Sequence, residues 1–135
     1  MRLPISALAL ALLLAPSAQA FADHAVAGNN QKATFSCAED PSVSITGNQN
    51  TITITGKCTS ISLAGNQNRI TAASSSALLV SGNGNTAAIA RVDAIVVPGN
   101  ENKITYEGAL TAKGKTRITK VGNKNTVSKS SPKKP

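Results

Sequence analysis

The stretch that decides the fold is SITGNQNTITITGKCTSISLAGNQNRITAA, which runs from Ser44 to Ala73. It contains the tetrapeptide GNQN twice, at residues 47–50 and 65–68, and a strand-like run follows each copy. The pattern GNxN, in which x is any residue, recurs at 82–85, 99–102 and 122–125, with steps of 18, 17, 17 and 23 residues. A short, nearly fixed period of this kind marks a repeat architecture.

Apolar residues in these runs alternate with polar ones, as expected of half-buried strands. When the repeats are aligned, the apolar positions form columns; one column contains Ile52, Ile70, Ala87, Ile104 and Val127. A single short strand buries little, but stacked strands build a continuous core. The sequence therefore predicts an all-β fold, a small parallel β-helix (β-solenoid) of about four to five coils with repeats of 17–18 residues. Two strands per coil and a three-sided coil of roughly six residues per face both fit this length.

The GNxN motif suits a sharp corner, because Gly takes a positive φ without steric cost and Asn tolerates the left-handed region. Stacking places the motif asparagines in two columns. One holds Asn48, Asn66, Asn83, Asn100 and Asn123, and the other holds Asn50, Asn68, Asn85, Asn102 and Asn125. Side-chain amides in register can hydrogen-bond along the stack, so we expect asparagine ladders. A ligand-binding role is the alternative, which recurrence in every coil disfavours.

The N-terminal residues match a secretory signal peptide. A short basic start precedes an apolar run over residues 5–15, which is too short to span a bilayer, and small residues follow. We expect residues 1–20 to be the signal peptide, with cleavage after Ala20 or Ala22, and the protein to be exported to the periplasm or the extracellular space. No later segment has the length and hydrophobicity of a transmembrane span, so none is predicted.

Three regions are expected after the signal peptide. They are a flexible leader over residues 21–32, the solenoid over 33–128, and a disordered basic tail over 129–135. The step of 23 residues indicates an insertion at one corner, where GALTAKGK at 108–115 replaces the usual three residues. In the last coil Lys120 stands at an inward position, which is typical of a capping coil.

The two cysteines, Cys37 and Cys58, predict a disulfide, because an isolated pair in an exported protein is usually bonded. The alternative, a metal site, needs more ligands than two thiols and His24 readily supply. Cys37 and Cys58 lie one coil apart near the same corner, so the bond would staple the N-terminal coil. A loop of this size contributes about 3 kcal/mol to stability.

Positive charge is concentrated in the C-terminal part of the chain. Residues 103–135 contain nine Lys or Arg and one acid, whereas residues 21–102 contain four basic and five acidic residues. The candidate anion-binding residues are Lys113, Lys115, Arg117, Lys120 and Lys124. A basic end attracts anionic polysaccharide, lipopolysaccharide phosphate or a membrane surface. Alternatively, the charges cap the solenoid and prevent end-to-end stacking.

An apolar strip is expected on the face that precedes each GNxN motif. Its outward positions include Leu79 and Val96 in adjacent coils, flanked by polar residues in the neighbouring coils. Contiguous exposed apolar area indicates a partner, a self-interface or a covering segment. The leader and the 108–115 insertion are the candidates for such a cover.

The sequence contains few residues in arrangements that catalysis requires. Asp93 and Glu101 fall at opposite ends of a strand, whereas paired-carboxylate chemistry needs carboxyl groups within about 5–10 Å. His24 is the only histidine, and no phosphate-binding glycine motif or metal-spaced cluster is present. We therefore predict no enzyme, no catalytic residue, no metal site and no cofactor. Export and the scarcity of aromatic residues argue against a nucleic-acid partner.

The signal peptide, the early cysteine pair and the motifs GNQNTITIT, GNQNRIT and GNENKIT resemble a bacterial domain-of-unknown-function family of small exported proteins (number 3060). The resemblance covers roughly residues 33–128 by repeat spacing. It implies a β-solenoid, and it carries over no activity and no catalytic residue. The repeats also resemble curlin repeats, although glutamine occurs in them only at Gln49 and Gln67 and the coil is shorter.

These features predict an exported β-solenoid of the cell envelope with a structural or binding role. One alternative is a surface or matrix assembly protein that stacks through the solenoid ends or the apolar strip. Another is a binder of anionic glycan or lipopolysaccharide through the basic C-terminal end. The partners that these alternatives imply are a second copy of the chain and an anionic envelope polymer.

Overall fold

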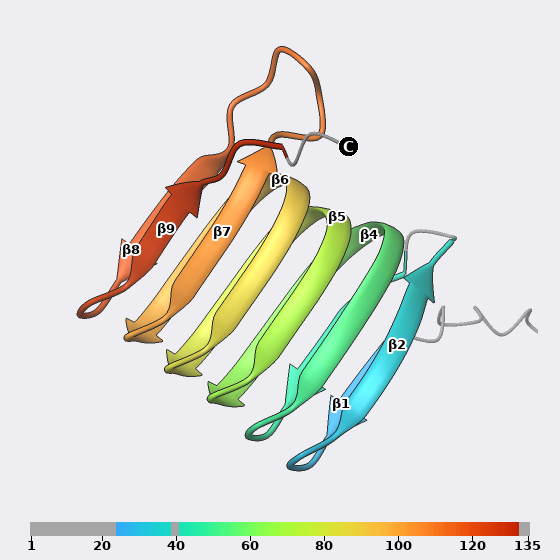
Figure 1. Ribbon diagram of the computed structural model, residues 1–135, viewed down its shortest axis with the longest axis vertical. Coiled ribbons are helices and arrows are strands. Elements are labelled where there is room, and N and C mark those ends of the chain that lie inside the picture. Colours follow the sequence, from blue (N-terminus) through green and yellow to red (C-terminus); the bar gives the residue numbers. More distant parts are fainter. Residues whose placement is uncertain (1–23, 39–40, 133–135) are drawn as a thin grey trace, which may run out of the picture.

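The computed structural model describes residues 24–38 and 41–132. This part of the chain contains nine strands and no helix, wound into a parallel β-solenoid of about five turns (Figure 1). The strands are β1 (His24–Ala27), β2 (Lys32–Cys37), β3 (Val43–Thr46), β4 (Thr51–Asn66), β5 (Arg69–Asn83), β6 (Thr86–Asn100), β7 (Lys103–Gly108), β8 (Arg117–Val121) and β9 (Thr126–Lys129). All pairings between these described strands are parallel. The predicted fold class is confirmed.

The solenoid has two layers. Strands β4, β5 and β6 each run along the front layer, turn through a rounded bend and return along the back layer, which ends at a GNxN corner (Figure 1). We call the layer that contains β2, β7, β9 and the first halves of β4–β6 the front sheet. The back sheet contains β1, β3, β8 and the second halves of β4–β6. Each coil thus has two faces, and the three-sided alternative does not apply.

The core lies between the two sheets and consists of stacked aliphatic columns. On the front sheet Ile52 pairs with Ile70, and the column continues through Ala87 to Ile104, all with 1% or less of their surface exposed. On the back sheet Leu63, Val80 and Val97 form a column that is fully buried. Burying one such side chain contributes about 1.5–3 kcal/mol, so a core poor in aromatic residues still stabilises the stack.

At each corner, Gly and the variable x residue take the unusual backbone conformations. Gly65 has φ 132° and Gln67 has φ 56°. The expectation that the motif asparagines occupy the left-handed region is therefore wrong. Asn66 and Asn68 are absent from the positive-φ residues, because their backbone and side chains are committed to the stack.

The leader expected at residues 21–32 contributes structure to the solenoid from His24 onward. β1 pairs with β3, and β2, which begins at Lys32, pairs with β4. Between them, residues 28–31 (GNNQ) form a sixth corner, with Gly28 at φ 133° and Asn30 at φ 56°. The expected flexibility over 24–32 is wrong, because this segment completes the first turn. Residues 21–23 and the signal peptide over 1–20 lie outside the described residues.

The basic tail also begins inside the fold. Lys129 is the last residue of β9, and the Ser130 N–H donates a hydrogen bond of 2.7 Å to the Tyr106 carbonyl. The predicted disorder is therefore wrong at Lys129, which pairs with Tyr106. Residues 133–135 lie outside the described part.

The insertion extends the bend between β7 and β8. Its Leu110 N–H donates a 3.0 Å hydrogen bond to the Asp93 carboxylate, and the Thr116 hydroxyl donates one of 2.7 Å to the Val92 carbonyl. These bonds fasten both ends of the segment to the preceding coil. The insertion leaves Leu79 and Val96 exposed, so it does not cover the apolar strip.

The predicted disulfide between Cys37 and Cys58 is confirmed. Both residues are buried, their Cα atoms are 5.0 Å apart, and the bond links β2 to β4 near the bend. No helix within the described residues is long and apolar enough to cross a membrane.

Candidate functional site

The motif asparagines form two hydrogen-bonded ladders. In the outer ladder, which is exposed at the corner, the Asn48 side-chain carbonyl accepts hydrogen bonds of 3.0 Å from the N–H and the amide of Asn66. In the inner ladder, the Asn68 N–H donates 2.9 Å to the Asn85 side-chain carbonyl. The Asn68 amide also donates 2.9 Å to the Gly47 carbonyl. The side-chain amides of the inner ladder therefore donate their hydrogen bonds to other residues of the fold.

The same pattern repeats along the stack. The other ladder asparagines also donate hydrogen bonds to a neighbouring coil; they are Asn50, Asn83, Asn100, Asn102, Asn123 and Asn125. At the first corner Asn29 accepts the outer bond from Asn48, and the Gln31 backbone N–H donates the inner bond to Asn50. Among the described residues, no buried side-chain nitrogen or oxygen lacks a partner. The side-chain amides of these columns therefore join neighbouring coils to one another.

The C-terminal end of the solenoid carries a dense group of cations. Seven of them are exposed: Lys103, Lys113, Lys115, Arg117, Lys120, Lys124 and Lys129. One ion pair occurs among the described residues, between Lys124 and Glu101 at 3.2 Å. Both of its side chains are more than half exposed, so the pair contributes about 0–1 kcal/mol to the stability of the fold. The positive charge of the other cations is not neutralised by this pair.

Two of these cations stand where core residues stand in other coils. Lys120 pairs in register with the buried Val97, and Lys129 pairs with Tyr106. A lysine ammonium cannot be buried cheaply without a partner. The two aliphatic columns therefore end in charges that hold this end of the stack in water.

A cavity of about 250 Å³ opens beside these lysines. Lys115 from the insertion, Lys129 from β9 and Tyr106 from β7 line it together with Thr116. The small residues Gly108, Ala109 and Gly114 complete the wall. Two ammonium groups and a phenol provide donors for an anionic group such as a carboxylate or phosphate, whereas the Thr116 hydroxyl already donates its proton to the Val92 carbonyl.

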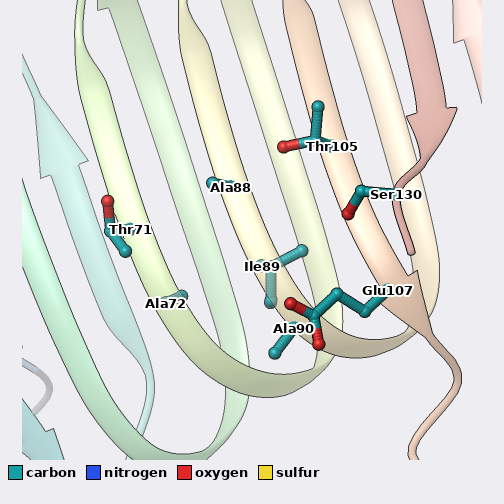
Figure 2. A pocket seen from close by; sticks show the side chains of 8 residues that line it. All are labelled: Thr71, Ala72, Ala88, Ile89, Ala90, Thr105, Glu107 and Ser130. Carbon is teal, nitrogen blue, oxygen red and sulfur yellow. The ribbon is translucent and has the colours of Figure 1, made fainter. Parts of the chain in front are cut away.

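A second depression lies on the outward side of the front sheet. Its volume is about 190 Å³, and Ala72, Ala88, Ile89 and Ala90 are its apolar lining. The side chains of Thr71, Thr105, Glu107 and Ser130 surround these residues (Figure 2). This depression therefore combines an apolar floor with hydroxyl groups and one carboxylate.

The five predicted anion-binding residues are spread over three elements. Lys113 and Lys115 lie in the insertion, Arg117 and Lys120 lie on β8, and Lys124 lies at the last corner. Of these, Lys115 lines the end cavity.

Sequence reasoning missed two lining residues, Tyr106 and Lys129. Tyr106 is not among the predicted anion-binding residues, and Lys129 falls within the predicted disordered tail. The signal was present, because Lys129 follows Val127 by two residues and so continues the column of Tyr106.

The apolar strip lies on the outward side of the back sheet. Leu79 is 37% exposed and its register partner Val96 is 38% exposed. Val121, which pairs with Pro98, adds a third large apolar side chain that is 59% exposed. The strip itself spans two coils, because Val96 pairs with the polar Thr119 in the last coil.

The described acidic residues lie apart from one another. Asp93 accepts a hydrogen bond from the insertion, Glu101 pairs with Lys124 at a corner, and Glu107 faces outward on the front sheet. Among the described residues, no group of three or more His, Cys, Asp or Glu could hold a metal ion.

A family described as a protein of unknown function (DUF3060) matches the chain twice, over residues 45–91 and 75–112. The overlapping matches together span residues 45–112, half of the 135-residue chain, and overlap is natural for a sequence whose repeats resemble one another. No curated protein and no solved structure matches the chain significantly. The repeats, their corners and this match lead to one assignment: the chain belongs to the DUF3060 family of proteins of unknown function.

Proposed function

We propose that this protein is an exported, non-catalytic β-solenoid that binds an anionic glycan of the cell envelope through its basic C-terminal end. The observation that carries the proposal is the cavity between Lys115 and Lys129 within a surface of seven exposed cations. Clustered like charges raise the local concentration of a polyanion and speed its association.

The arrangement of the cations supports a binding role beyond that of a cap. Lys120 and Lys129 occupy the inward columns of the last coil, so they suffice to keep another coil from stacking there. The insertion adds Lys113 and Lys115, and Lys115 contributes to a concave site with Tyr106. A concave, donor-rich site is what recognition of an anionic group needs, whereas a cap needs only charge.

Export is part of the proposal and rests on the N-terminal sequence together with the disulfide. Residues 1–20 match a secretory signal, and disulfides such as Cys37–Cys58 persist in oxidising compartments. An anionic glycan is the polyanion that such a protein meets at the cell envelope. The nucleic-acid alternative is less suited to that location.

A role without catalysis is supported by the separation of the acids. Asp93 and Glu101 each have a structural partner at opposite ends of a coil, and Glu107 faces a different surface from the lysine-lined cavity. Hydrolysis of a glycosidic bond requires two carboxyl groups across one bond. A surface that only binds does not need that pair.

The test compares two triple variants of equal charge change. Lys113→Gln/Lys115→Gln/Arg117→Gln removes three charges from the C-terminal end, and Lys32→Gln/Lys57→Gln/Arg69→Gln removes three from the other coils. Binding to immobilised polygalacturonate is measured at several salt concentrations. Each exposed charge contact is worth about 0.5 kcal/mol, so the first variant should bind about tenfold more weakly. Its binding should also depend less on salt, because fewer screened contacts remain.

The second variant is the control for net charge, and it should bind like the unmodified protein. Equal weakening in both variants would mean that net charge alone drives retention and would contradict a localised site. Absence of binding to polygalacturonate, heparin and lipopolysaccharide at low salt would overturn the proposal as a whole.

A second candidate function is self-association through the apolar strip. Leu79 and Val96 are register partners whose side chains lie exposed side by side on the back sheet, and adjoining exposed apolar side chains indicate a partner or a self-interface. The lysines in the last coil disfavour stacking through the C-terminal end, so a lateral contact through the strip is the favoured mode of assembly.

A further inference from the structure

We propose that the depression around Ala88 on the front sheet is a socket for one sugar ring of the glycan, separate from the lysine-lined cavity. This inference rests on the proposed glycan binding and adds a second subsite of different chemistry. It is carried by the shape of one side-chain column and by an unpartnered carboxylate.

The socket exists because one hydroxyl column is interrupted. The outward column on the front sheet consists of Thr34, Thr53, Thr71, Ala88, Thr105 and Ser128 in consecutive coils. Ala88 is the one member without a hydroxyl group. A depression of about 190 Å³ lies at this interruption, and Thr71 and Thr105 line it on either side of Ala88.

Glu107 bounds the depression from the next coil, where its side chain extends toward Ala90 (Figure 2). It is half-buried, and its carboxylate forms no hydrogen bond or ion pair with another described residue, although the surrounding segment is rich in lysine. Ser130 lies near it and donates its hydroxyl proton to the Tyr106 carbonyl at 3.3 Å, so the Ser130 oxygen is left as an acceptor.

The chemistry of these groups fits an uncharged, hydroxylated ring. The methyl groups of Ala88 and Ala90 provide a small apolar floor for the C–H face of a pyranose. The Thr71, Thr105 and Ser130 hydroxyls and the Glu107 carboxylate can accept hydrogen bonds from ring hydroxyl groups. The carboxylate repels an anion, so the charged substituent of the glycan belongs in the other cavity.

The two cavities lie on opposite sides of the same strands. Thr105 and Glu107 of β7 line the socket, whereas Tyr106 between them lines the lysine cavity. Ser130 and Lys129 are divided in the same way, as expected of alternating side chains. β9 is the terminal strand of this sheet in the described residues, so a glycan chain that passes around it can reach both sites.

The decisive variant is Ala88→Thr, which fills the socket with the residue found at four other positions of the column. Threonine suits an exposed strand, so the fold should be retained. Binding is measured with a hyaluronan oligosaccharide, in which uncharged N-acetylglucosamine rings alternate with charged glucuronate rings, and with inorganic polyphosphate, which has no rings. We expect the hyaluronan oligosaccharide to bind about tenfold more weakly, as when a pocket loses room for one ligand group, and polyphosphate to bind as before.

Two further variants complete the test. Ala64→Thr makes the same substitution on the outward side of the back sheet and should leave both ligands unaffected. Glu107→Ala removes the carboxylate and should weaken binding of the hyaluronan oligosaccharide alone. Melting curves of each variant show whether the fold is intact.

The outcomes separate this inference from the proposed function. If Ala88→Thr and Glu107→Ala bind the hyaluronan oligosaccharide normally while the C-terminal triple variant loses both ligands, the socket is overturned and the basic site stands. Equal loss of both ligands in Ala88→Thr would also overturn it, because polyphosphate has no ring. If none of the variants changes binding to either ligand, both proposals fail.

Discussion

Gly65 lies directly over Gly47 in the stack, with φ values of 132° and 129°. A Cβ built on Gly65 would overlap the Gly47 carbonyl oxygen of the coil before it. We expect Gly65→Ala to lower the free energy of unfolding by about 3 kcal/mol, since backbone strain and a steric clash add together. Urea denaturation measures this loss.

Gly28→Ala is the matched control at the residue scale. Gly28 has the same φ of 133°, but the nearest atoms to its added Cβ belong to the Gln31 side chain at 3.7 Å, because no described coil lies beneath it. It should cost about 1 kcal/mol from the backbone conformation alone. Equal losses in the two variants would show that the stacking contact does not require glycine.

At the scale of elements, the disulfide fastens the first front strand, β2, to β4. We expect Cys37→Ala/Cys58→Ser to lower stability by about 3 kcal/mol, the loop-closure contribution of a bond of this span. Serine is chosen at position 58 because its register partner in the next coil is also a buried serine, Ser75. The Ser75 hydroxyl donates a 2.7 Å hydrogen bond to the Ala77 carbonyl, so this position of the coil accommodates a buried hydroxyl group.

Amide hydrogen exchange locates the effect of that substitution. Protection should fall in β1, β2 and β3, while β5 and β6 in the middle of the stack keep theirs, because each coil contacts mainly its neighbours. Uniform loss of protection over all strands would contradict a staple that acts on the first turn.

At the scale of the whole molecule, the two flat faces and the charged end decide how copies can meet. We expect the protein to grow in mass with concentration in sedimentation velocity at moderate salt, and Leu79→Asp to abolish that growth by placing a charge in the apolar strip. Ser62→Asp is the control, because Ser62 is the register partner of Leu79 in the preceding coil. A single small species at all concentrations would exclude self-association through the strip.

Much of the fold could be predicted because a solenoid repeats its rules along the chain. The alternation around Ile52 and Ile70 and the recurrence of GNxN specify strands, corners and a shared core. The first corner was missed because residues 28–31 read GNNQ, with Gln31 in place of the last asparagine. The backbone N–H of Gln31 still donates the ladder bond of 2.8 Å to Asn50, so the corner forms without an asparagine there.

The corners show why the conformational preference of asparagine alone does not predict which residue takes a positive φ. Asn tolerates a positive φ, which suggested that the motif asparagines take the left-handed region. In the structure Gln67, Glu101 and Lys124 take it instead, and their exposed side chains take no part in the asparagine ladders. Gln67 accepts a hydrogen bond from Gln49 at 3.2 Å, and Lys124 pairs with Glu101. Hydrogen bonds between coils therefore override the local preference of asparagine.

The sequence by itself determined the parallel solenoid, its period, its disulfide and its basic end, because these depend on local patterns that recur in every coil. Only the tertiary structure decided which residues share a cavity. Lys115 lines one cavity with Lys129 and Tyr106, because the insertion folds back on the last coil. Glu107 and Thr71 line the other depression, because stacking places residues that are far apart in the chain around one site. Such contacts arise from packing between coils, and no local pattern records them.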